Sequence, residues 1–201
     1  MTGEAASTIS RAPTEERDGR RLRSQDSRAR IVAAMLALIR EGETSPSAEM
    51  VAGRANVGLR TVFRHFKDMD SLYREMSEVI EEEVLFIKDL PFTATDWRGK
   101  LIELIDRRLE LFERIAPFKR ASDINRHRSR FLGRGATRLT ITLREILSGI
   151  APPQEIGDPK IFEALDLLLS FEAWSRMRLE QHLSQDEVRD VLRAVIGRLT
   201  A

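Results

Sequence analysis

The chain has 201 residues, of which 42% are hydrophobic and 32% charged, and its formal net charge is +1. This composition is typical of a globular protein with one or two domains and excludes a chain that is disordered throughout. The absence of cysteine excludes a disulfide framework and a thiolate metal site. The three histidines are too scattered in the sequence to predict a metal site of their own. No apolar run approaches the roughly 20 residues that span a bilayer. We therefore expect a cytoplasmic protein with no metal, no cofactor and no membrane partner.

The N-terminal half begins with an arm, residues 1–23, that is rich in Ser, Thr, Glu and Arg and is expected to be at least partly disordered. Beyond it, apolar residues recur at steps of three and four with no alternating stretch, which predicts an all-α fold. The first four helices are expected over residues 27–40, 48–55, 59–66 and 70–88. Gly42 is a plausible stop for the first helix, and Ser47 is a good N-cap for the second.

Pro91 and residues 93–95 interrupt this pattern, and we place a domain boundary there. An N-terminal three-helix domain then covers residues 24–72, with a connecting helix to about residue 88, and a C-terminal domain covers residues 89–201. Its helices are expected over residues 96–115, 117–126, 129–147, 159–181 and 185–199, with a surface loop over 148–159. Ser184 and Glu187 predict a capping box for the last helix. The charged residues of 103–110 have the helical spacing of surface ion pairs.

Residues 47–66 are the most informative part of the chain. Two short predicted helices flank Asn56 and Gly58, residue types that tolerate positive φ in a tight turn. From residue 54 to residue 67 there is no acidic residue, and the basic residues are Arg54, Arg60, Arg64 and Lys67. A basic helix face is often simply solvated. Here it occurs in a helix–turn–helix pattern, whose second helix enters the major groove of DNA in proteins that use this motif.

At these positions the chain resembles the TetR family of transcriptional repressors. The matching residues are Val51-Ala52, Ala55-Asn56, Val57-Gly58, Thr61-Val62-Phe63, His65-Phe66 and Asp70-Ser71-Leu72, with weaker support from Phe171-Glu172-Ala173-Trp174 and the last amphipathic helix. The sequence departs from the family pattern at Asn56, which replaces a Gly, and at Gly58, Phe63 and Met69, where groups that usually hold phosphates are missing. Arg60, Arg64 and Lys67 are expected to compensate for them.

The resemblance implies a DNA contact for each position of the motif. Arg60 is the best candidate for reading a base, with a phosphate contact as the open alternative. Glu49 aligns with a position that reaches a base, and the N-terminal N–H groups of the helix at Ser47 suit a phosphate. The arginines of the arm and first helix either reach DNA or form a solvated surface. The full predicted DNA-binding set is Ser47, Ala48, Glu49, Gly58, Leu59, Arg60, Thr61, Phe63, Arg64, His65 and Lys67.

The resemblance also implies a C-terminal domain that dimerises and encloses a pocket for an effector. The last two helices would pair with those of a second copy as a four-helix bundle, although their apolar stripes also suit an ordinary core. Candidate dimer residues are Ile161, Leu165, Leu168, Val191, Val195 and Leu199. Candidate pocket residues, each of which also suits the core, are Phe112, Phe118, Phe131, Leu139, Phe171 and Trp174.

We therefore expect a homodimeric transcriptional regulator, a repressor that a small molecule releases from a near-palindromic DNA operator. The alternative is a helical interaction or adaptor protein whose basic helix binds an acidic protein surface. A helical-bundle hydrolase is more remote, because the chain has no Gly-rich phosphate loop after a strand, no nucleophile elbow and no HExxH motif. We do not expect an enzyme.

Overall fold

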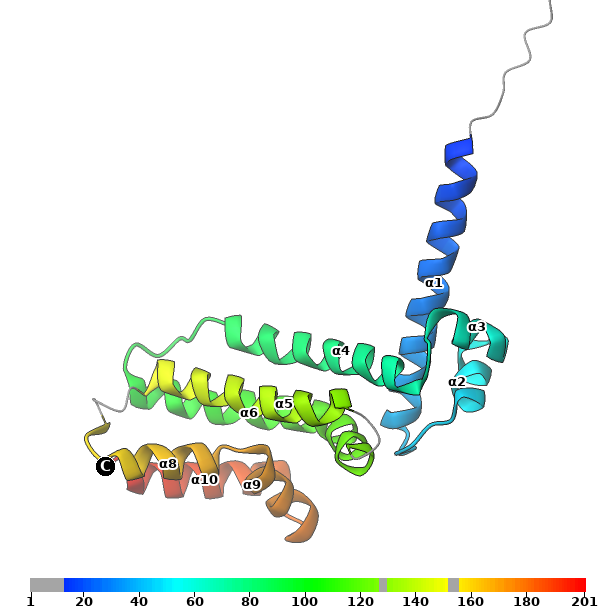
Figure 1. The fold of residues 1–201 in the computed structure, drawn as a ribbon. Helices are drawn as coiled ribbons and strands as arrows, with labels where there is room; N and C mark the ends of the chain where they lie inside the picture. Colours follow the sequence, from blue (N-terminus) through cyan, green and yellow to red (C-terminus); the bar gives the residue numbers. More distant parts are fainter. Residues whose placement is uncertain (1–12, 127–129, 152–155) are drawn as a thin grey trace, which may run out of the picture.

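The structure is a computed structural model that describes residues 13–126, 130–151 and 156–201, and this part of the chain is helical without a strand (Figure 1). The all-α class predicted from the sequence is therefore confirmed. The helices are α1 Pro13–Arg40, α2 Ala48–Ala55, α3 Leu59–His65, α4 Met69–Asp89, α5 Trp97–Asn125, α6 Arg130–Ile150, α8 Pro159–Leu168, α9 Phe171–Ser175, the π-helical turn η1 Arg176–Glu180, and α10 Gln185–Leu199. Within the described residues, no helix is both long enough and apolar enough to cross a membrane.

The first helix is longer than the sequence predicts. It begins at Pro13 rather than near residue 27, so residues 13–23 are helical where partial disorder was expected, and residues 1–12 lie outside the described part. Proline suits the first turn of a helix because its missing N–H has no intrahelical partner there. The end of the helix is as predicted: α1 stops at Arg40, and Gly42 has a φ of 100°.

The three N-terminal helices pack around a shared apolar core. Figure 1 shows α2 and α3 side by side against the end of α1 that lies farthest from the N-terminus. The buried residues at their contacts include Ile31, Met35, Val51, Val62 and Phe66, each no more than 2% exposed. These side chains fix the direction in which the outer face of α3 points.

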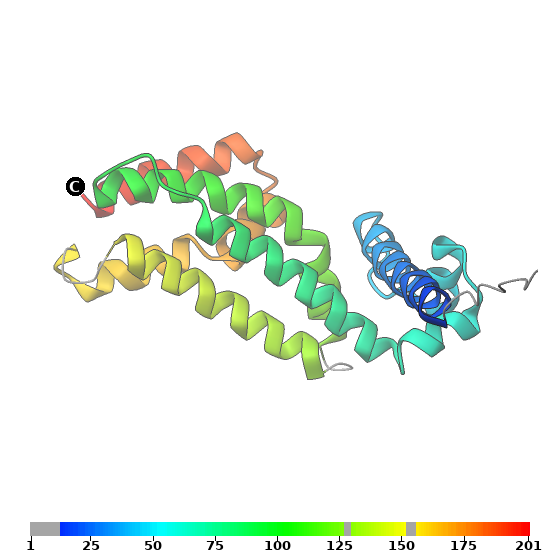
Figure 2. The same cartoon turned by 90° about the horizontal axis from the view of Figure 1, so that it is seen from above.

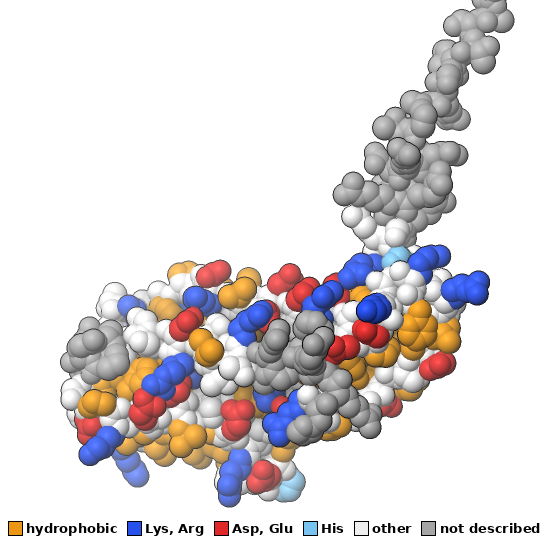
Figure 3. Space-filling view, viewed as in Figure 1, with side chains coloured by type: hydrophobic (Ala, Val, Ile, Leu, Met, Phe, Trp, Pro, Cys, Tyr) orange, Lys and Arg blue, Asp and Glu red, His pale blue; other side chains and the backbone are white. Residues whose placement is uncertain are grey.

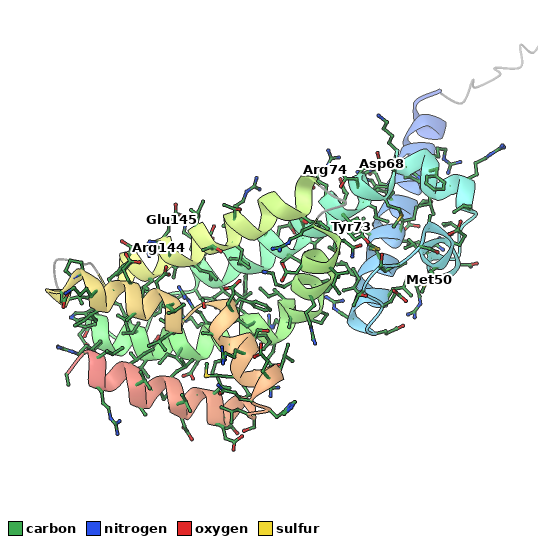
Figure 4. All side chains as sticks on the ribbon, turned by 60° about the horizontal axis from the view of Figure 1, so that its bottom comes forward. Met50, Asp68, Tyr73, Arg74, Arg144 and Glu145 are labelled. Carbon is green, nitrogen blue, oxygen red and sulfur yellow. The ribbon has the colours of Figure 1, made fainter. Side chains whose placement is uncertain are left out.

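Helix α4 begins with a capping box centred on Asp68, which Figure 4 labels at the start of the helix. The Asp68 carboxylate accepts a bond from the Ser71 N–H at 2.8 Å, and the Asp68 N–H donates to the Ser71 hydroxyl at 3.3 Å. The sequence placed the start at Asp70 or Ser71, close to this cap. Because the cap immediately follows α3, it sets the angle at which the connecting helix leaves the three-helix unit.

The remaining helices form the C-terminal bundle. Figures 1 and 2 show α4, α5 and α6 running alongside one another, with α8 and α10 paired on the other side of α5 and α6. Their contacts bury a large core, with Ile105, Phe112, Leu147, Leu165 and Val188 among its least exposed members. Helix α10 has the predicted bounds and the predicted capping box between Ser184 and Glu187.

Two helix boundaries in this bundle differ from the sequence prediction. Pro117 lies inside α5, although two separate helices were expected, and Figures 1 and 2 show the last turns of α5 leaving the axis of the rest. A proline ring removes one backbone hydrogen bond and bends a helix without always ending it. The single helix expected over residues 159–181 is interrupted after Leu168, because the hydroxyl of Ser170 caps a new helix by accepting from the Ala173 N–H at 3.1 Å.

The two predicted domains share part of their packing. Phe118 and Ala121 of α5 and Leu132 of α6 belong to the same buried cluster as the three N-terminal helices. Asn125, 1% exposed at the end of α5, donates to the Thr44 carbonyl at 2.8 Å and accepts from the Ser45 hydroxyl at 3.2 Å. The loop between α1 and α2 is thus fastened to the C-terminal bundle.

Candidate nucleic-acid interface

The turn between α2 and α3 has its left-handed residue at Asn56. Its φ and ψ are both 51°, and its N–H donates back to the Ala52 and Gly53 carbonyls, while the Val57 N–H bonds to Ala52 at 3.0 Å. Asparagine tolerates this conformation better than most residues, as the sequence suggested. Gly58 has an ordinary extended φ of −69° and serves as the N-cap of α3 without a side-chain bond. Glycine's freedom is therefore not needed at position 58.

The outer face of α3 presents basic and apolar side chains to solvent. Arg60, Phe63, Arg64 and Lys67 are exposed, Leu59 is 38% exposed, and Thr61 is partly buried, while Val62 anchors the opposite face. Within the described part of the chain, the side chains of Arg60, Arg64 and Lys67 have neither an ion pair nor a hydrogen bond. Figure 3 shows Lys and Arg side chains at the end of the molecule where Figure 1 places α1 and α3. Free cations on one helix face are available to phosphates and to base edges.

Arg54 does not belong to this free group. Its guanidinium forms a two-point ion pair with the carboxylate of Glu41, at the end of α1, with Nη1 to Oε1 at 2.7 Å. Each partner's pKa is displaced in favour of the charged form, chiefly by this hydrogen bond. The segment from residue 54 to residue 67 has no acidic residue of its own, but the fold brings an acid to its first arginine. The unpaired basic residues of this face are therefore Arg60, Arg64 and Lys67, without Arg54.

The N-terminus of α2 lies beside this face. The Ser47 hydroxyl accepts from the Met50 N–H at 3.2 Å, and the Ala48 side chain is buried, so Ala48 can offer DNA only its backbone. Glu49 is exposed, and its pKa lies below the ordinary value because of its own backbone N–H and the Ser47 hydroxyl. A carboxylate there repels phosphate and suits a base amino group. Met50, labelled in Figure 4, is 41% exposed on the same helix and was not predicted from the sequence as a site residue.

His65 lies at the inner edge of the face. It is partly buried, and its Nε2 is enclosed with no hydrogen-bond partner among the described residues. Burial and the charges of Arg64 and Arg28 lower the pKa of His65 below its ordinary value of 6.5, so the ring is neutral at pH 7. An enclosed Nε2 and a neutral ring make His65 a weaker phosphate ligand than the sequence pattern suggests.

Two arginines of α1, Arg28 and Arg30, bond to the ends of α2 and α3 and so stabilise the three-helix unit. Arg28 donates to the His65 carbonyl at 2.9 Å, pairs with Glu75 of α4 at 2.6 Å, and places its guanidinium 4.4 Å from the Phe66 ring centroid. Arg30 donates to the carbonyls of Ala55 and Asn56. The sequence left open that the arginines of the first helix reach DNA, but the donors of Arg28 and Arg30 fasten the ends of α2 and α3. The side chains of Arg20, Arg21 and Arg23 lie outside the described residues.

Comparisons with known proteins agree with this geometry. No family model and no curated protein matches the chain. Among solved structures, a putative TetR-family transcriptional regulator from Rhodococcus sp. is 18% identical, with a TM-score of 0.67 over 88% of this chain and 100% of that one. A putative transcriptional regulator from Streptomyces coelicolor A3(2) is 23% identical, with a TM-score of 0.66 over 87% and 98%. The multidrug binding protein EbrR, solved with imidazole, is 19% identical, with a TM-score of 0.65 over 87% and 89%.

The chain has the TetR fold. Its helix–turn–helix unit, connecting helix and C-terminal bundle match those solved structures over most of the chain. The resemblance first noted at residues 47–72 therefore extends to the whole architecture.

In this TetR fold a cavity of about 100 Å³ lies between α4, α5 and α6. Its lining is mainly apolar, and Leu139 is the lining residue that was predicted from the sequence. The other lining residues are Ser77, Ile80, Glu81, Val84, Leu85, Ile115, Lys119, Ser122, Leu132, Arg138 and Thr142. A second cavity of about 40 Å³ shares Lys119 and Leu139 with the first and is also lined by Phe171.

The other predicted pocket residues lie elsewhere in the TetR fold. Phe112 and Trp174 line neither cavity and pack with Phe171 as a buried aromatic cluster, with ring centroids 5.1 to 5.8 Å apart. Phe118 belongs to the core shared with the helix–turn–helix unit. The side chain of Phe131 is outside the described residues. Phe112, Phe118 and Trp174 are thus core residues, the alternative that the sequence left open for them.

The predicted dimer residues divide into two groups. Val191 and Val195 of α10 are 41% and 37% exposed, and Ile161, Leu168 and Leu199 are partly buried. Leu165 is fully buried in the protomer's own core, so its side chain cannot reach a partner. The outward position on α8 is Leu167, which is 67% exposed. An apolar strip over α8 and α10 thus remains on the surface of the protomer.

Among the described residues, no group of His, Asp or Glu side chains is arranged to hold a metal ion.

Proposed function

We propose that the protein is a DNA-binding transcriptional regulator. The observation that carries the proposal is the outer face of α3, where Arg60, Arg64 and Lys67 are exposed and unpaired beside the N-terminus of α2. A short helix with free cations, held by a second helix through a buried apolar face, has the dimensions and chemistry to enter a major groove. The solved structures of the same fold that are described as transcriptional regulators support this proposal.

The proposed regulator acts as a homodimer. The strip formed by Leu167, Val191 and Val195 suits pairing with the same strip on a second copy, which buries both. Two-fold symmetry would place two recognition helices about one DNA turn, roughly 34 Å, apart, so the operator is a near-palindrome. Val195→Asp should convert the dimer to a monomer in sedimentation velocity. Phe86→Asp, at an exposed apolar residue of α4, is the matched control and should stay dimeric.

The proposed regulator is a repressor that a small molecule releases from its operator. The cavity between α4, α5 and α6 borders the connecting helix, and α4 is tied to the end of α3 through Arg28 and Glu75. A ligand can weaken DNA binding only by the difference between its own affinities for two conformations, the one that binds DNA and the one that does not. A ligand that moves α4 from within the cavity would therefore also move α3, because Arg28 and Glu75 connect the two helices.

A DNA shift assay tests the proposal and separates it from a helical adaptor that binds an acidic protein surface. Genomic fragments that the full-length protein retains are selected, and a retained palindrome is compared with a scrambled sequence of equal length at several salt concentrations. A regulator prefers its site to random DNA by about 10³-fold or more. Equal affinity for both sequences would contradict the proposal and favour the adaptor.

A further inference from the structure

Arg108 is a buried charge that no carboxylate contacts directly among the described residues, although the charge of Asp166 acts on it at longer range. Its side chain is 2% exposed in the middle of α5, where the sequence predicts a surface pair with neighbouring acids. Its Nη1 donates to the Leu169 carbonyl at 2.6 Å and its Nη2 to the Leu143 carbonyl at 2.5 Å, while Nε has no partner. Among the described residues, no carboxylate lies within ion-pair distance of the guanidinium. Burial lowers the pKa of Arg108 to about 10, which still leaves it charged at neutral pH.

The two carbonyl bonds explain only part of this arrangement. Arg108 cross-links α5 to α6 and to the end of α8, which accounts for two of the five N–H donors of a guanidinium. A neutral donor would make the same bonds without the unfavourable desolvation of a full charge. A cation kept at this position is best explained if an anion joins it.

The small cavity next to Arg108 has room for the missing group. The residues that line this cavity of about 40 Å³ include Arg108, Lys119, Leu139, Asp166 and Glu172. Its acids are already paired: Asp166 bonds to Arg144 at 2.7 Å, and Glu172 lies 3.7 Å from Lys119. Figure 4 shows Arg144 on α6, the helix that faces α8. Among the cations that line this cavity, Arg108 is thus the one with no carboxylate in direct contact, and Asp166 reaches it only as a longer-range charge.

The larger neighbouring cavity supplies an apolar compartment. It shares Lys119 and Leu139 with the small cavity, and Ile80, Val84 and Ile115 are among its lining side chains. Its volume of about 100 Å³ is somewhat below the roughly 150 Å³ of an engineered apolar cavity that holds benzene. A ligand that occupies both compartments therefore has one acidic end and an apolar group near the size of a benzene ring.

We propose that the effector is a small amphipathic acid, whose carboxylate pairs with Arg108 and whose apolar group lies between α4, α5 and α6. This inference rests on the proposed regulator function, since it names the chemical class of ligand for that effector site. A carboxylate would add charge-assisted hydrogen bonds to a buried guanidinium, where the low local dielectric makes such bonds strongest.

Isothermal titration of the full-length protein tests the inference with probes that differ at one end. We expect 3-phenylpropionate to bind at least about ten times more tightly than 3-phenyl-1-propanol, because hydrogen bonds to charged groups contribute more than neutral ones. 3-Phenylpropylamine should bind more weakly than either. If the alcohol or the amine binds as tightly as the acid, or if no probe binds, the inference is wrong. This comparison uses only the wild-type protein and remains decisive if a variant does not fold.

Variants of Arg108 then test whether this residue binds the carboxylate of the probe. Arg108→Gln should abolish the preference for the acid, whereas Arg108→Lys should retain part of it because the charge remains. The matched control is Arg107→Gln, one residue earlier, whose guanidinium bonds to the Leu90 and Pro91 carbonyls away from the cavities. A preference that survives Arg108→Gln would overturn the assignment. The shift assay is independent: acid binding without DNA binding would reject the regulator alone, and DNA binding without acid binding would reject this inference alone.

Discussion

The salt dependence of DNA binding should distinguish the free cations of the helix–turn–helix unit from the paired one. Arg64→Gln removes one exposed, unpaired charge from each protomer, hence two from a dimer on its operator. Each lost phosphate contact flattens the slope of log K against log salt by about 0.9, so the expected change is about 1.8. Between roughly 50 and 200 mM salt, the wild type should therefore lose about twelve-fold more affinity than the variant.

The control for this experiment is a charge-neutral double variant. Glu41→Gln with Arg54→Gln removes the ion pair between α1 and α2 but leaves the net charge of the face unchanged. Its salt slope should match that of the wild type. Fluorescence anisotropy with a labelled operator gives the slopes. Equal flattening in both variants, or none in Arg64→Gln, would refute the division into free and paired cations.

Three further outcomes are expected. Arg60→Ala should weaken operator binding by about 1–3 kcal/mol and relax one base position in a selection experiment, whereas an equal loss on every sequence would identify a phosphate contact. Asn125→Ala should lower the free energy of unfolding by about 2 kcal/mol in urea at fixed protein concentration, because the bonds to Thr44 and Ser45 are lost; no change would contradict that role. The lowered pKa of His65 means that the unfolded chain takes up a proton first as pH falls, so stability should decrease below about pH 6.5. His65→Gln should show a flatter stability profile between about pH 7 and 5, and an identical profile would argue against it.

Features that depend on neighbours in the sequence were predictable. The capping box at Ser184 and the left-handed residue at Asn56 follow from side chains within a few positions, and both are present. Helix boundaries that depend on tertiary packing were not. Pro117 reads as a helix start, yet the surrounding bundle keeps one continuous α5 around it, because buried residues on both sides of the proline hold the helix in place.

The same distinction applies to the candidate site. The exposure of Arg60 and Arg64 follows from helical periodicity. The pairing of Arg54 with Glu41 brings together two helices and has no local signal. Arg108 lies among charged neighbours that do form surface pairs, such as Arg107 with Glu103 at 3.5 Å, so composition alone places it outside. Only the apolar residues at three- and four-residue steps from it, Leu104, Ile105, Leu111 and Phe112, indicate the buried side of α5.

The buried cluster of the helix–turn–helix unit includes three residues of the C-terminal bundle, Phe118, Ala121 and Leu132. This limits how the unit can be fused to the C-terminal bundle of another protein. A fragment that ends at Asp89 would lack all three, and loss of a buried phenylalanine alone typically costs about 3–5 kcal/mol. The helix–turn–helix unit is therefore not expected to fold when it is moved alone to another C-terminal bundle. A folded hybrid needs a junction that carries the second half of α5 and the first turn of α6 along with the helix–turn–helix unit.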